Sequence, residues 1–203
     1  MKKIIVLSLI ILFLVSMAWA QEKCEAPVWN VGDTWTYKFT DGNTQTREVV
    51  EVSNDLFIVK NKESQNLSAY DRKTMNLKHL IDEKGKKVEA ITGVRKLYDF
   101  PIMVNKMWSD TSVSIPETGG RRYATFENEF KIVSTEIITT PAGKFECYKI
   151  YYQRRNVTSQ KSGGWAHYWY SPEVKAWVKW EYDMSTTFWS SPTNAELISY
   201  KIK

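Results

Sequence analysis

Residues 34–40 read Thr-Trp-Thr-Tyr-Lys-Phe-Thr, and this stretch decides the fold class. Its aromatic residues alternate with threonine and lysine, so the three rings fall on one face of an extended chain and the polar side chains on the other. Asp41-Gly42 follows directly, and this dipeptide is typical of the tight turn of a β-hairpin. The stretch therefore predicts a half-buried strand that returns as a second strand over residues 47–53.

The same two-residue period continues along the chain, whereas no window of twelve residues after residue 20 shows a convincing helical period. Residues 93–105 contain Gly93 and Pro101, lack clean alternation and are expected to form a connection, with one helical turn as an option. We predict a mainly β fold, an antiparallel half-barrel or barrel of about ten strands with little helix. Further strands are expected at residues 56–60, 77–81, 88–91, 108–115, 123–126, 130–139, 145–154, 165–171, 176–183 and 197–202.

The first twenty residues have the three parts of a secretory signal, namely Lys2-Lys3, the apolar run from Ile4 to Val15, and Ala18-Trp19-Ala20. An uncleaved membrane anchor is the alternative, but the run is shorter than the roughly 20 apolar residues that span a bilayer. We therefore expect residues 1–20 to be cleaved, residues 21–203 to form a single β domain, and bacterial Sec-type export to the periplasm or the exterior. No transmembrane segment is expected after cleavage.

Two cysteines, Cys24 and Cys147, remain after cleavage. Acylation of Cys24 is disfavoured because the polar residues Gln21-Glu22-Lys23 precede it. Export permits a Cys24–Cys147 disulfide, which would join the N-terminus to a central strand. The alternative is a buried thiol at Cys147 beside an exposed free thiol at Cys24.

The charge of the chain gives no sign of a nucleic-acid partner. Without Lys2 and Lys3, 26 basic residues face 23 acidic ones, and the basic residues are scattered. A nucleic-acid binder would cluster them on one face. Arg121-Arg122 and Arg154-Arg155 are the only adjacent arginine pairs and are best interpreted as solvated strand ends.

Two halves of the sequence also resemble each other. Residues 31–35 (VGDTW) resemble residues 104–108 (VNKMW). Residues 69–72 (AYDR), which precede residues 75–80, likewise resemble residues 169–172 (WYSP), which precede residues 176–180. Either the chain contains two similar halves, or short strands match by coincidence.

Catalytic and metal-binding patterns are absent from the sequence. His79 and His167 stand in no metal-ligand spacing, and there is no nucleophile elbow or phosphate-binding glycine loop. Both histidines are therefore expected to be core or sheet-surface residues, and no cofactor or metal is predicted. A hydrolase would need two converging carboxylates, for which Glu173 and Glu181 are the candidates.

Aromatic residues are the unusual feature of the C-terminal part. Five tryptophans lie between residues 165 and 189. Strict alternation would place Trp180 and Tyr182 on one face of their strand and Trp177 on the other. Bulky rings can simply fill a thin sheet, but they can also line an apolar pocket or stack on sugars. The residues we expect to contact a ligand are Trp165, Trp169, Trp177 and Trp180.

Three segments resemble an uncharacterised family of bacterial exported proteins. These are residues 29–37 (WNVGDTWTY), 140–150 (TPAGKFECYKI) and 168–179 (YWYSPEVKAWVK), which carry Gly-Asp-x-Trp-x-Tyr, Thr-Pro-Ala-Gly-x-Phe and Trp-Tyr-Ser-Pro motifs. The resemblance implies an antiparallel half-barrel or barrel in the cell envelope. It is similar in style to periplasmic lipoprotein carriers, which hold acyl chains in a concave sheet, although this sequence lacks their lid helices. That comparison is one of fold alone.

These observations favour a non-catalytic envelope protein whose curved sheet binds an apolar or amphipathic ligand, or a protein partner. A carbohydrate-binding module that uses the same rings is the first alternative. A carboxylate-dependent hydrolase is the second. The sequence leaves the ligand and the oligomeric state undetermined.

Overall fold

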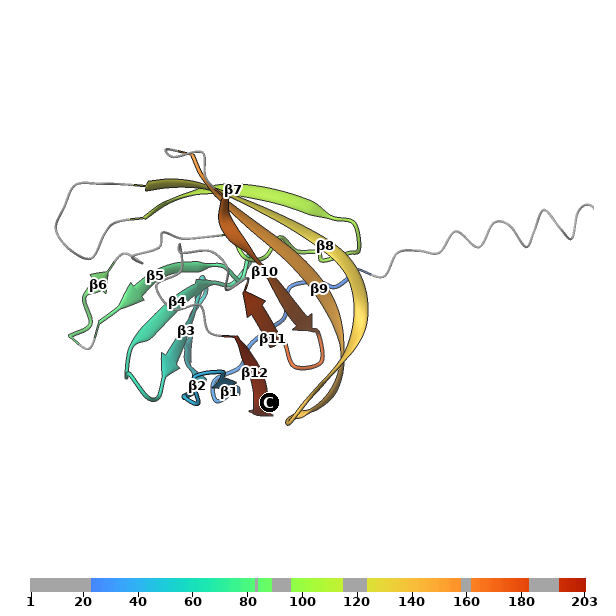
Figure 1. The fold of residues 1–203 in the computed structure, drawn as a ribbon. Helices are drawn as coiled ribbons and strands as arrows, with labels where there is room; N and C mark the ends of the chain where they lie inside the picture. The colour runs from blue at the N-terminus through green and yellow to red at the C-terminus, as the bar shows by residue number, and fades with distance from the viewer. Residues whose placement is uncertain (1–22, 83, 89–95, 115–123, 158–161, 183–193) are drawn as a thin grey trace, which may run out of the picture.

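The chain forms one large curved β-sheet, seen in a computed structural model (Figure 1). The structure describes residues 23–82, 84–88, 96–114, 124–157, 162–182 and 194–203. Within these ranges there is no helix. Residues 96–106 connect two strands without a helical turn. The predicted signal at residues 1–20 lies outside the described residues.

The described parts of the chain form twelve strands. The first six are β1 (Thr34–Phe39), β2 (Thr44–Val52), β3 (Leu56–Asn61), β4 (Leu67–Asp71), β5 (Leu77–Ile81) and β6 (Lys87–Val88). The second six are β7 (Met107–Ser114), β8 (Ala124–Thr140), β9 (Gly143–Asn156), β10 (Ser162–Ser171), β11 (Ala176–Tyr182) and β12 (Ala195–Lys201).

Neighbouring strands in the sheet are neighbours in sequence, with one exception. The order is β6-β5-β4-β3-β2-β1-β12-β11-β10-β9-β8-β7, and every pairing is antiparallel. The exception is β1, which pairs with β12 and so joins the N-terminal six strands to the C-terminal six. Because β6 and β7 end the order without pairing to each other, the described sheet is an open half-barrel, as predicted.

The structure confirms that the two halves are similar. Gly32 and Asn105, at matching positions before β1 and β7, both have left-handed backbone, with φ of 91° and 68°. Each N–H donates to the second strand of its half, that of Gly32 to the Val49 carbonyl on β2 and that of Asn105 to the Ile132 carbonyl on β8, both at 2.8 Å. Matching turns and matching bonds therefore set the same register in both halves.

Irregularities in the ladders repeat as well. Each half has one bulge between its second and third strands and another between its fourth and fifth strands. Between the second and third strands, the register shifts between Val49 and Glu51 in the first half and between Ile132 and Ser134 in the second. Between the fourth and fifth strands, it shifts between Ala69 and Tyr70 in the first half and between Trp169 and Tyr170 in the second.

A single long strand, β8, replaces the two strands predicted at residues 123–126 and 130–139. The polar stretch between them looked like a break, but Asn128 is completely buried and fully bonded. Its amide donates to Asp110 Oδ1 (2.7 Å) and Ser112 Oγ (2.9 Å), and its oxygen accepts from the Tyr152 hydroxyl (2.8 Å). These partners compensate the cost of burying a polar side chain within a strand.

Together β8 and β9 form a long curved hairpin, the arm, whose tip bends back toward β12 (Figure 1). The Ala142 N–H donates to the Leu197 carbonyl at 3.4 Å. The rings of Phe145 and Tyr200 lie 5.7 Å apart, edge to face. The arm therefore makes a second connection between the outer strands of the C-terminal half and the centre of the sheet.

Two connecting segments cover the inner face, which we define as the face that carries Trp35, Tyr37 and Tyr170. Residues 23–31 and 96–104 meet in a short antiparallel bridge between Cys24 and Ile102, with N···O distances of 2.8 and 2.7 Å. Rings from both segments lie in the buried core. The apolar inner face is thus covered by chain rather than by a second sheet.

Asn76 is expected to hold the second of these segments in place. Its side chain donates to the Tyr98 carbonyl and accepts from the Tyr98 N–H, both at 2.9 Å, in a buried position. Replacement Asn76→Ala should lower the free energy of unfolding by about 1–3 kcal/mol, because two buried backbone groups lose their partners. Urea unfolding of this variant, with the exposed Asn66→Ala as control, measures the effect. Equal stability of both variants would contradict it.

Candidate functional site

Trp177 is the centre of an aromatic cluster on the inner face. Its ring stacks on Tyr98 with centroids 4.7 Å apart and planes 10° apart, and it lies 5.1 Å from Tyr168. The Tyr70, Phe57 and Trp29 rings continue the cluster across the N-terminal half, where Trp29 lies 5.4 Å from Phe57 and 5.6 Å from Tyr70. Such a surface offers a large apolar contact area.

A small space remains among these rings, the inner cavity, with a volume of about 60 Å³. Of the described residues that line it, only Arg47 carries a formal charge. The others are Trp29, Trp35, Tyr37, Val59, Tyr70, Leu97, Tyr98, Ala176 and Trp177.

A larger depression, the rim groove, lies where β1, β11 and β12 meet and has a volume of about 360 Å³. Trp180 and Phe39 form its apolar part, with ring centroids 5.7 Å apart. Trp180 also lies 5.0 Å from Tyr37, which lines the inner cavity. One aromatic wall therefore separates the two spaces. The remaining lining is Lys38, Thr40, Gly42, Lys179, Glu181, Asn194, Ala195 and Glu196.

Two phenols at the inner cavity, those of Tyr37 and Tyr98, are kept neutral. Burial raises the pKa of both Tyr37 and Tyr98 well above the ordinary value, and only the positive charge of Arg47 opposes this effect. These phenols therefore do not ionise near neutral pH, and each side chain presents an apolar ring with a polar hydroxyl at its tip.

The structure divides the four predicted tryptophans between two faces. Trp177 lines the inner cavity and Trp180 the rim groove, while Trp165 and Trp169 lie on the opposite, outer face of β10. The prediction that Trp177 and Trp180 face opposite ways is wrong, because the bulge in β11 pairs them with Tyr170 and Tyr168 on one face. Whether any of the four contacts a ligand stays a prediction.

Trp169 is buried although it faces outward. Its indole N–H donates to Glu136 Oε1 at 3.0 Å, and the amines of Lys149 and Lys179 each lie 5.2 Å from its ring centre. Both lysines are also ion-paired, Lys149 with Glu136 and Lys179 with Glu181. These contacts give Trp169 a structural role on the outer face.

Trp165 is the exposed member of the group, with 38% of its surface accessible. The Tyr151 ring lies 6.5 Å away at an angle of 29°, and the His167 ring lies 5.0 Å away, edge-on. These three side chains form a small aromatic platform on the outer face.

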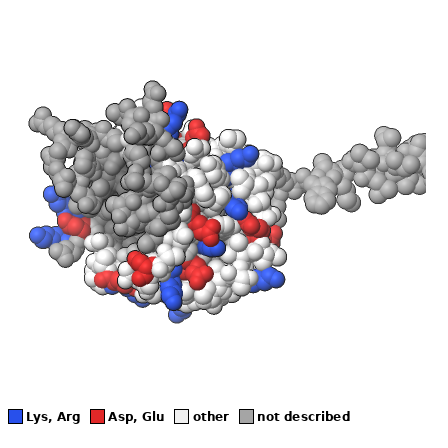
Figure 2. All heavy atoms as spheres, viewed as in Figure 1, with Lys and Arg blue, Asp and Glu red and all other residues white. Residues whose placement is uncertain are grey.

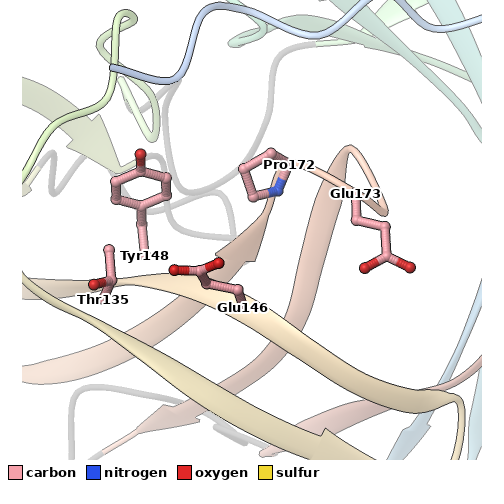
Figure 3. Close-up of a pocket in the computed structure, with 5 residues that line it drawn as sticks. All are labelled: Thr135, Glu146, Tyr148, Pro172 and Glu173. Atoms are coloured by element: carbon pink, nitrogen blue, oxygen red, sulfur yellow. The ribbon is translucent and has the colours of Figure 1, made fainter. Parts of the chain in front are cut away.

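The arm encloses a third space, the arm pocket, of about 230 Å³ against the β10–β11 turn. Figure 3 shows Glu146 and Glu173 at this pocket with their carboxylates pointing away from each other. Glu173 accepts a hydrogen bond from the Tyr200 hydroxyl at 3.2 Å. Glu181, its predicted hydrolase partner, lies on the outer face in an ion pair with Lys179 at 2.6 Å. The two predicted carboxylates thus share none of the three pockets described here.

Neither Cys24 nor Cys147 forms a disulfide in the described structure, so the predicted bridge is not confirmed. Cys24 lies beside Tyr170, where it adds to the effect of burial in raising the pKa of that phenol. Tyr170 pairs with Tyr148, and Cys147 is the next residue along β9, so its side chain points to the opposite face. Burial raises the pKa of Cys147 to about 12, which makes it an unreactive core thiol.

The described residues contain no group of three or more histidine, cysteine or carboxylate side chains placed to hold a metal. Within the described ranges no helix has the length and hydropathy needed to span a membrane. On the face seen in Figure 2, basic and acidic residues are interspersed.

Sequence reasoning missed Arg47 and Tyr98. Arg47 begins the predicted second strand, and the pattern there gave no sign of which face it occupies. Tyr98 lies in the segment expected to be a plain connection, yet it stacks on Trp177. The pairing of Arg47 with Trp35, set by the hairpin, is the signal that would have placed it on the inner face.

Residues 101–192 match the model of the DUF3108-like family. None of the curated protein sequences compared with the chain matches it. Over 96% of both chains, the fold is similar to that of the hypothetical lipoprotein YmcC from Escherichia coli (K12), with a TM-score of 0.51 and 9% identity. This similarity concerns the fold alone.

Two further structures are more distant. A candidate exported protein with a YmcC-like fold from Bacteroides fragilis matches at 16% identity and a TM-score of 0.40, over 88% of this chain and 99% of that one. A candidate lipoprotein from Parabacteroides distasonis matches at 16% identity and a TM-score of 0.38, over 89% and 100%.

His167 is expected to make the protein less stable in mild acid. Burial first and then Lys149 lower its pKa below the ordinary 6.5, against weaker opposite effects of Glu181 and Glu136. The unfolded chain therefore binds the proton before the folded chain does, and the free energy of unfolding falls as the pH drops below 6.5. The slope should not exceed about 1.4 kcal/mol per pH unit, because one proton is involved.

Urea unfolding of His167→Gln between about pH 5.5 and 7.5 measures this contribution, because neutral glutamine takes up no proton. The variant should have a shallower slope than the natural chain. His79, whose pKa burial also lowers, provides the comparison His79→Gln. An unchanged slope in the double variant would exclude both histidines.

Proposed function

We propose that this chain is an exported cell-envelope protein that binds an apolar or amphipathic ligand, without catalysis, on the inner face of its sheet. The observation that carries the proposal is the aromatic wall of Tyr37 and Trp180. This wall stands between the inner cavity and the rim groove and exposes rings to both.

The size and lining of the two spaces support this function. The rim groove, at about 360 Å³, lies within the usual range of roughly 300–1,000 Å³ for small-molecule sites. The inner cavity alone would hold only a small group, but it continues the same apolar surface. An elongated ligand that lies along the wall would bury apolar area on both sides, at about 25 cal/mol per Å².

The inner-cavity lining also suits binding better than reaction. It consists of aromatic and aliphatic side chains, neutral phenols and one guanidinium. General acid–base chemistry needs a group whose pKa lies near the working pH, and a phenol with a raised pKa does not meet that need. The signal-like residues 1–20 support export, together with the resemblance of the sequence to exported proteins.

Filling the inner cavity should weaken binding. Leu97 lines it and is half-buried, so Leu97→Trp can place its larger ring there. Titration of the natural chain with hexadecanoate and with hexadecanol should change tryptophan emission saturably, and Leu97→Trp should weaken the binding at least about tenfold. Native mass spectrometry of freshly purified protein should show a co-purified lipid.

Val28→Trp is the matched control, because Val28 is 60% exposed and does not line the cavity. It should bind as the natural chain does, and thermal unfolding should confirm that both variants are folded. If neither hexadecanoate nor hexadecanol binds the natural chain, the proposed function is wrong.

The exposed platform of Trp165, Tyr151 and His167 favours carbohydrate binding as a second candidate. Sugar faces stack on such rings. Trp165→Ala should abolish tryptophan quenching by oligosaccharides and leave hexadecanoate binding unchanged. Quenching that survives in Trp165→Ala would remove this platform as a sugar site.

A further inference from the structure

We propose that Arg47 is the anion-binding residue of the inner-face site, and that the ligand is an amphipathic anion whose carboxylate or phosphate group contacts this guanidinium. The inference rests on the proposed function and adds the chemical class of the ligand. It concerns a residue for which the sequence pattern suggested no role.

Arg47 lies half-buried on β2, opposite Trp35 in the ladder with β1. Its guanidinium carbon is 5.3 Å from the centre of the Tyr37 ring and 5.9 Å from that of Trp180. It therefore contacts both rings of the wall between the inner cavity and the rim groove. The two rings restrict its position at a place that a bound ligand would also contact.

Most of the hydrogen-bonding capacity of Arg47 is unused by the described residues. Arginine has five N–H donors. Within the described ranges, this side chain makes one hydrogen bond, from Nε to Gln45 Oε1 at 2.9 Å. No described carboxylate lies within ion-pair distance of it. The planar fork of terminal N–H groups matches a carboxylate or phosphate in two-point contact.

Three half-buried or exposed cations of the C-terminal half differ from Arg47, because each is ion-paired within the described residues. Lys149, Lys179 and Arg155 each form an ion pair with a glutamate. The described residues that line the inner cavity include no carboxylate, and burial raises the pKa of the Tyr37 and Tyr98 phenols, so these two stay protonated. A half-buried positive charge in an apolar setting attracts an anion more strongly than an exposed one does.

The second half of the chain shows that the fold does not require a charge at this position. Trp108 corresponds to Trp35. Trp35 lies three positions after Gly32, and Trp108 lies three positions after Asn105, the two residues with left-handed backbone. Trp108 pairs with Phe130 as Trp35 pairs with Arg47. Phe130 is 2% exposed, and its ring stacks on Trp108 at 5.1 Å. In the second half an apolar ring therefore occupies the position that corresponds to Arg47. In the first half the position carries a charged side chain, and it lines the inner cavity.

The test compares ligands that differ only in the head group. Hexadecanoate, hexadecyl phosphate and neutral hexadecanol are each titrated, below their aggregation limits, into the natural chain and into Arg47→Phe. The variant copies Phe130, so it should remain folded. We expect the natural chain to bind the two anions about tenfold to a hundredfold more tightly than the alcohol. Arg47→Phe should bind all three ligands alike.

Arg72→Gln is the matched control. Its guanidinium carbon also lies 5.3 Å from a ring, that of Phe57, but it does not line the inner cavity, so this variant should keep the preference for anions. A readout on the natural chain avoids dependence on folding of the variants. The NMR signal of Arg47 Nε–H should shift on addition of hexadecanoate and not on addition of hexadecanol.

The outcomes separate the two proposals. Equal binding of anions and alcohol by the natural chain, or an anion preference that persists in Arg47→Phe, overturns the role of Arg47 and leaves apolar binding intact. Failure of all three ligands to bind overturns the proposed function itself. Preference for hexadecyl phosphate over hexadecanoate indicates a phospholipid-like head group, and the reverse preference indicates a fatty acid. Both preferences support the assignment of Arg47.

Discussion

The antiparallel ladder between β1 and β12 holds together two six-stranded halves whose other strands pair only within their own half. It runs from Thr34 opposite Lys201 to Phe39 opposite Ala195. A buried carboxylate, Asp33, reinforces the start of the ladder by accepting from the backbone N–H of Lys203 at 2.8 Å. Because this seam aligns the two halves, it places Tyr37 on β1 next to Trp180 on β11, and both sides of the candidate site depend on it.

Covering the inner face creates the second condition for the site. A curved sheet with one apolar face must bury that face, and here two connecting segments do so through Trp29 and Tyr98. Segments without regular structure fill the space less evenly than a second sheet would, and a small cavity remains beside Tyr98. The register of the β1–β2 hairpin places a half-buried guanidinium, that of Arg47, at the wall of this cavity.

Much of the fold was predictable because strand alternation and turn residues are local signals. The alternation over residues 34–40 and the two similar halves both match the structure. The failures have specific physical causes. A bulge reverses the expected orientation of Trp177, and a polar residue at Asn128 is satisfied by partners distant in sequence, so it does not end its strand.

The candidate site was harder to predict for a related reason. Aromatic enrichment drew attention to β10 and β11, but the sequence alone cannot say which rings share a face when bulges interrupt the alternation. The role of Arg47 was not predicted, because its face depends on the hairpin register. That no described carboxylate pairs with it became clear only from the assembled site. Which side chains line the candidate site, and which of them are ion-paired, therefore depends on contacts in the folded sheet that local sequence patterns do not reveal.

The seam between the first and last strands also brings the chain before β1 close to the chain after β12. The Asn30 side chain donates to the Lys203 carbonyl at 3.0 Å, so the chain just before β1 touches the chain just after β12. A peptide linker from Lys203 to the start of residues 23–31 would keep this covering segment and its buried Trp29, and new ends could be made between β6 and β7, the two strands that end the order of the sheet. Such a circular permutant would keep every strand pairing of the natural chain while exchanging which half is synthesised first.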